Sequence, residues 1–234
     1  MTMHSSSVRD VPTGAAALGM AATYLLGFAY FGGVWAYPTD APAPDRIAYL
    51  ADHRVAVHLA YVTIYLVFGG LLSVLVVRLR ARMPSGTLMQ MATLFGAVWV
   101  GLVLASGMLL TTGLQAAVAL AENDPERAAE VWDVVALLAD SIGGGNELVG
   151  GLWALLTSLH ARTHGWFSAR LNILGLSVGT VGVATVYPSE VLPAVFGVAQ
   201  LVWFVGVGYA LLSRREVFVP ASAEAHDGLV RPAV

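Results

Sequence analysis

Three carboxylates stand in one long apolar stretch at intervals of seven residues: Asp133, Asp140 and Glu147. A charged side chain near the centre of a bilayer costs at least about 2.5 kcal/mol, so such residues need a partner, a proton or water. In a helix that advances about 100° per residue, seven steps drift by only about 20°, which puts the three carboxylates on one face. This graded row favours binding or conduction of a proton or cation.

Small residues share that face, because the stretch around the carboxylates is DSIGGGNELVGG. Small side chains let helix backbones approach closely in lipid, so we expect this face to point into a bundle. The triglycine fits either an intact, closely packed helix or an unwound segment whose carbonyls line a cavity. A purely structural role is the alternative, in which Asn146 and Glu147 only satisfy backbone groups and lock helices together.

Counting residues from the ends of each apolar stretch places Glu147 near the membrane midplane, at the level of Tyr65 and Gln200. We expect Glu147 to be protonated and to donate a hydrogen bond to one of these two groups. His58 has a depth similar to that of Asp133, which suggests an ion pair. The predicted ligand- or proton-binding residues are Asp133, Asp140, Asn146, Glu147, His58, Tyr65 and Gln200; no metal site, cofactor or catalytic residue is predicted.

The composition is that of a membrane protein, since 57% of the 234 residues are hydrophobic and only 12% are charged, with a mean hydropathy of +0.73. The sequence has no cysteine, which excludes disulfides and thiolate metal sites. It has no lysine either, which excludes a retinal-type Schiff base. The small net charge of −3 and the lack of a basic run argue against nucleic-acid binding.

Apolar runs of membrane-spanning length predict an all-α, polytopic bundle of six spans over residues 1–215, followed by a disordered cytoplasmic tail at 216–234. The expected spans are about 14–37, 55–77, 87–112, 131–160, 171–187 and 191–212. Nine of the twelve arginines then lie on the side of the two termini, and only Arg46, Arg54 and Arg127 lie on the other. This asymmetry predicts that both termini are cytoplasmic.

The connections suggest further elements. The first outer connection is either a plain solvated loop or a short interfacial helix, DRIAYLADHR, capped by Asp45. Asn123 or Asp124 can cap the fourth long helix, with Pro125 in its first turn, so the third and fourth helices should form a hairpin that extends beyond the membrane. GLSVG at 175–179 favours helix packing within the bundle over the alternative, dimerisation. His160 and His164 are expected at a solvated interface.

From Gly145 the chain continues GNELVGGLWALLTSLHARTHGWFSARLNILGLSVGTVGV and then FGVAQLVWFVGVGYALL. This part resembles a group of bacterial integral-membrane proteins of similar length, classed as a domain of unknown function. In that group a glutamate-containing span passes through a Gly/Leu-rich segment and a short basic turn into a glycine-rich span. The resemblance implies a bacterial inner-membrane bundle of six or seven helices and supplies no activity; no clear seventh span is evident here.

The leading hypothesis is a multi-pass inner-membrane protein that binds or translocates a small solute, proton or cation through a cavity lined by the carboxylates of span four. The alternative is a non-catalytic accessory or assembly protein that docks partner helices, or a second copy of itself, through Gly-rich faces. A third hypothesis is an intramembrane enzyme that uses Asp140 and Glu147 as an acid/base pair on a lipid-like substrate. A cavity reaching Glu147 would favour the first hypothesis.

Overall fold

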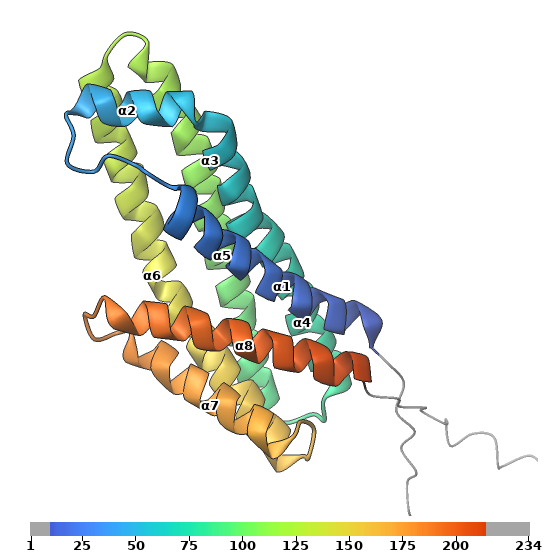
Figure 1. Ribbon diagram of the computed structural model, residues 1–234. Coiled ribbons are helices and arrows are strands. Elements are labelled where there is room, and N and C mark those ends of the chain that lie inside the picture. Colours follow the sequence, from blue (N-terminus) through green and yellow to red (C-terminus); the bar gives the residue numbers. More distant parts are fainter. Residues whose placement is uncertain (1–9, 214–234) are drawn as a thin grey trace, which may run out of the picture.

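The structure, a computed structural model, describes residues 10–213, with the backbone alone at 143–145, and over this range it is all-helical (Figure 1). Two π-helical segments, Tyr30–Val34 and Val62–Val67, extend α1 and join α3 to α4. The predicted tail at 216–234 lies outside the described residues. The helices are α1 (Val11–Ala29), α2 (Ala43–Asp52), α3 (Arg54–Tyr61), α4 (Phe68–Arg82), α5 (Thr87–Ala121), α6 (Pro125–Thr163), α7 (Ala169–Ala184) and α8 (Val191–Ser213).

Four helices are long and apolar enough to cross a membrane: Val11–Val34, Arg54–Arg82, Thr87–Ala121 and Val191–Ser213. They agree with four of the six predicted spans. The other two predicted spans also form helices: α6 is longer and contains the three carboxylates, whereas α7 is apolar and has only 16 residues.

Local capping explains where several helices begin. The Asp124 side chain accepts the backbone N–H of Arg127 at 3.0 Å, and Pro125 occupies the first turn of α6, as the sequence predicts. The interfacial segment is helical rather than a plain loop, because it forms α2. The prediction that Asp45 caps this helix is wrong, because α2 already starts at Ala43 and Pro42 is its N-cap residue. Pro44 fits the first turn because its missing N–H has no helical acceptor there.

The long hairpin predicted between the third and fourth helices is confirmed, since α5 and α6 pack along each other and only residues 122–124 join them (Figure 1). With 35 and 39 residues they rise about 52 and 58 Å, well above the roughly 30 Å of a hydrocarbon core. The α6 helix is continuous through residues 143–145. Of the two alternatives for the triglycine, the intact helix is therefore confirmed and the unwound segment is wrong.

Glycines set the closest helix crossings. A Cβ built on Gly151 of α6 would lie 2.8 Å from the Gly182 backbone of α7, and one on Gly208 of α8 would lie 3.0 Å from the Gly14 carbonyl of α1. In the GLSVG segment, Gly179 faces the backbone of Gly151 and Leu155 in α6, and Gly175 faces the Ser158 side chain of α6. Their predicted role in packing within the bundle is therefore confirmed.

Two hydrophobic clusters make up the core. The larger one joins α1, α4, α5, α6, α7 and α8 around the buried rings of Trp99, Trp153, Trp203 and Phe204. The smaller one lies where α2 and α3 pack on α5 and α6, around Leu50, Tyr61, Leu114 and Trp132. Tyr65 packs against both clusters, so it marks the level at which they meet.

Candidate functional site

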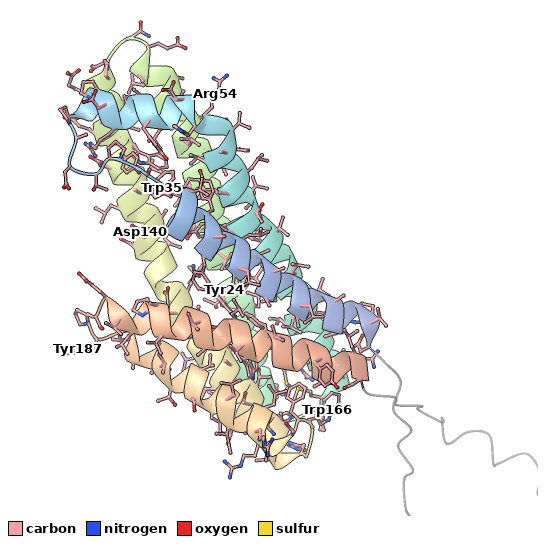
Figure 2. All side chains as sticks on the ribbon, in the orientation of Figure 1. Tyr24, Trp35, Arg54, Asp140, Trp166 and Tyr187 are labelled. Atoms are coloured by element: carbon pink, nitrogen blue, oxygen red, sulfur yellow. The ribbon has the colours of Figure 1, made fainter. Side chains whose placement is uncertain are left out.

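A cavity of about 540 Å³ lies at the junction of the two clusters. Side chains from α1, the Arg54–Arg82 helix, α5, α6 and α8 form its walls. In Figure 2, Tyr24 on α1 and Asp140 on α6 mark two of its walls. Its lining residues are Thr23, Tyr24, Gly27, Phe28, Phe31, Ile64, Tyr65, Phe68, Trp99, Val103, Asp140, Asn146, Glu147 and Phe196.

The polar wall of the cavity comes mainly from α6. Asp140, Asn146 and Glu147 line it from one helix, and seven residues place the two carboxylates about 10 Å apart along the helix axis. Asp140 is exposed, whereas Glu147 is half-buried and its buried Oε2 has no hydrogen-bond partner among the described residues. The buried Oδ1 of Asn146 likewise has none. These acceptors are therefore free to interact with a ligand.

The opposite wall is aromatic. Tyr24 meets Phe68 edge to face with ring centroids 5.4 Å apart, and Phe68 meets Trp99 in the same manner at 5.6 Å. Tyr24 also lies 5.9 Å from Phe28. Because these rings support one another at distances typical of aromatic pairs, the wall has a fixed shape.

Four of the seven predicted site residues meet in this cavity: Tyr65, Asp140, Asn146 and Glu147. Gln200 does not line it; it is fully buried on α8, one turn from Phe196, and both of its amide atoms lack a hydrogen-bond partner in the described part of the chain. The hydrogen bond predicted between Glu147 and Gln200 or Tyr65 is therefore not formed. The resting protonation of Glu147 stays a prediction.

Asp133 and His58 lie apart from the cavity, and their predicted ion pair is wrong. Asp133 accepts two hydrogen bonds from the guanidinium of Arg46, at 2.8 and 3.0 Å. Arg46 comes from α2, which folds back over α5 and α6 and so brings an outer arginine to the start of the carboxylate row. The planar guanidinium matches a carboxylate in this bidentate way, whereas an imidazole cannot.

Asp10 forms a second polar centre that sequence reasoning missed. It begins α1, is 3% exposed, and accepts from Arg78 Nη2 at 3.1 Å and Arg82 Nε at 3.2 Å, both at the end of α4. Burial alone would raise the pKa of Asp10, but hydrogen bonds from Thr13 and Arg78 and the charge of Arg82 outweigh it and lower that pKa. The carboxylate therefore stays ionised where α1 meets α4.

Of the two histidines near the end of α6, one differs from expectation and one agrees with it. His160 is 1% exposed rather than solvated, and its Nε2 donates to the carbonyl oxygen of Pro84 at 2.9 Å. This bond fixes the connection between α4 and α5 against the end of α6. His164, after the helix, is exposed as predicted.

No model of a known protein family, no curated protein and no solved structure matches the chain. The chemistry of the cavity is therefore inferred from its own residues.

Proposed function

We propose that this protein binds or passes a small solute, proton or cation through the cavity lined by Asp140, Asn146 and Glu147. One observation carries the proposal: two carboxylates of α6 line a cavity of about 540 Å³ whose described lining contains no basic side chain. Carboxylates that only lock helices together would be paired with a cation or a donor, as Asp133 and Asp10 are. Asp140 and Glu147 face a space instead.

The proposal includes a six-span topology in a bacterial inner membrane with both termini in the cytoplasm. Four apolar helices, the length of α6 and the rise of about 24 Å over the 16 residues of α7 support six crossings. The start of α1 and the end of α8 lie at one end of the bundle, where Asp10 N–H donates to the Leu211 carbonyl (Figure 1). Arg78 and Arg82 lie at that same end, as expected of a cytoplasmic side.

Flux measurements on the purified protein in proteoliposomes test the function. We expect Glu147→Gln and Asp140→Asn to abolish uptake of a proton or solute that the wild type supports. Glu130→Gln is the matched control, because Glu130 is exposed on the same helix and its partner in the described part of the chain is Arg127. If wild type and both cavity variants behave alike across a broad panel of solutes and ions, the proposed transport is wrong.

An accessory role is the second proposal, and open glycine surfaces favour it. A Cβ built on Gly32, Gly33, Gly70 or Gly101 would meet no atom within 4 Å. Another helix can therefore approach the backbone closely at these positions. Under this proposal, Gly70→Leu and Gly101→Leu would release a co-purifying membrane protein or dissociate an oligomer, and the cavity variants would not.

A further inference from the structure

We infer that the ligand of the cavity is a hydrophobic organic cation, such as a quaternary ammonium or phosphonium compound, rather than a bare metal ion or an anion. This inference rests on the proposed binding function and names its ligand class. It follows from the aromatic lining, the charge, the size and the donor set of the cavity.

Half of the lining residues are aromatic, and they come from four different segments. They are Tyr24, Phe28, Phe31, Tyr65, Phe68, Trp99 and Phe196. Ring faces attract a cation through their quadrupole, and most strongly where water is excluded. Proteins usually hold quaternary ammonium groups, which cannot donate hydrogen bonds, in a cage of several aromatic side chains.

The charge of the cavity has one sign. Asp140 and Glu147 are its carboxylic acids, and the described lining includes no arginine or histidine. The nearest carboxylate on the same face, Asp133, is already neutralised by Arg46. An organic cation would supply the positive charge that the two remaining carboxylates lack, whereas an anion would meet them without compensation.

The size of the cavity and the few oxygen ligands in its lining argue against an inorganic ion. Cavities of about 300–1,000 Å³ hold drug-sized molecules, and about 540 Å³ falls within that range. Calcium requires about six to eight oxygen ligands at close range, and magnesium a near-ideal octahedron. The described residues contain no group of three or more His, Asp or Glu side chains that could hold a metal ion.

Access from the side suits an apolar cation. Phe28 is 44% exposed on α1, and Asp140 is exposed on α6, so two residues that line the cavity are also accessible at the surface of the bundle. A hydrophobic cation concentrates at a membrane and can approach from the lipid, where it first meets Phe28 and the Asp140 carboxylate. Glu147 lies two helical turns further along α6.

Calorimetric titration of the full chain in detergent micelles with tetraphenylphosphonium tests the inference, with protein-free micelles as the blank. Tetraphenylborate has nearly the same size and shape and the opposite charge. We expect tetraphenylphosphonium to bind at one site and tetraphenylborate to bind at least about tenfold more weakly, since like charges repel in a desolvated site. Equal binding of the two ions would overturn the inference.

Variants assign the binding to the cavity. Glu147→Gln should weaken tetraphenylphosphonium binding about tenfold, because the variant has no carboxyl group that can ionise when the cation binds. Phe28→Leu should weaken it a few fold, through loss of one ring face. Glu147→Asp keeps the charge and should bind within a few fold of wild type, which separates a charge effect from a folding defect. Glu130→Gln and Tyr209→Leu, both on exposed surfaces away from the cavity, should match wild type.

The inference and the proposed function fail separately. If a proton or inorganic-ion flux depends on Glu147 but tetraphenylphosphonium neither binds nor inhibits it, the ligand class is wrong and the function stands. If tetraphenylphosphonium binds in a Glu147-dependent way and no flux of any kind is found, the ligand class stands and only translocation is wrong. If Glu147→Gln and Glu130→Gln bind equally, the inference is overturned.

Discussion

At the scale of single residues, Asp10 makes stability depend on pH. Its pKa is lowered in the folded protein, so ionised Asp10 stabilises the fold above the ordinary carboxyl pKa of about 3.9. That contribution is lost as pH falls through the lowered folded value. We expect the wild type to melt at a higher temperature than Asp10→Asn in detergent at pH 7. The difference between the two melting temperatures should shrink below about pH 4. A difference that is constant from pH 7 to pH 3 would contradict this assignment.

The Arg46–Asp133 pair gives a second residue-scale prediction. The Asp133 side chain is 51% exposed and that of Arg46 is 18% exposed. Solvent screening therefore limits their coupling to about 0.2–1 kcal/mol in a double-mutant cycle of Arg46→Ala and Asp133→Ala. Chemical denaturation of the four proteins measures it. A cycle of His58→Ala with Asp133→Ala should give no coupling. Coupling in that cycle and none between Arg46 and Asp133 would support the His58–Asp133 ion pair that the sequence suggested.

The sequence predicts the members of the site better than their partners. Seven-residue spacing is enough to place Asp140 and Glu147 on one face, and both line the cavity. The partner of Asp133 could not be deduced in this way, because Arg46 reaches it only through the path of α2. Residues 87 positions apart in the chain meet there, and no helical period encodes that contact.

At the scale of helices, the α6–α7 crossing should be sensitive to a single methyl group. A Cβ on Gly182 would lie 2.6 Å from the Glu147 carbonyl oxygen and 2.7 Å from the Gly151 Cα, and backbone atoms cannot move aside as a flexible side chain can. We expect Gly182→Ala to lower the free energy of unfolding by about 1–3 kcal/mol through overpacking. Gly101→Ala is the control, because its Cβ meets nothing within 4 Å.

Thermal unfolding in detergent distinguishes the two glycine variants. Gly101→Ala should be neutral or slightly stabilising, since alanine is the better helix former by up to about 1 kcal/mol. Equal melting temperatures for Gly182→Ala and Gly101→Ala would mean that the crossing can open without cost. Because Gly182 also contacts the backbone of Glu147, the variant should reduce ligand binding together with stability.

Helix boundaries follow from the sequence where a cap or a proline defines them, and less well elsewhere. The start of α6 is fixed by Asp124 and Pro125, and the structure agrees. The fourth predicted span, at 131–160, covers only the apolar part of α6, which begins six residues earlier. Hydropathy indicates where the lipid should begin, whereas the helical hydrogen bonds continue beyond that boundary. The π-helical segments could not be predicted, since no local residue pattern requires them.

At the scale of the whole molecule, the membrane topology is open to a direct test, because the chain has no cysteine. Thr39→Cys lies in the exposed connection after α1, and Ser85→Cys in the exposed connection between α4 and α5. The six-span topology with cytoplasmic termini places Thr39 outside and Ser85 inside. In intact spheroplasts, a membrane-impermeant maleimide should label Thr39→Cys only, and should label Ser85→Cys after lysis. Labelling of Ser85→Cys before lysis would mean that the orientation is the reverse, with Asp140 nearer the cytoplasmic side than Glu147.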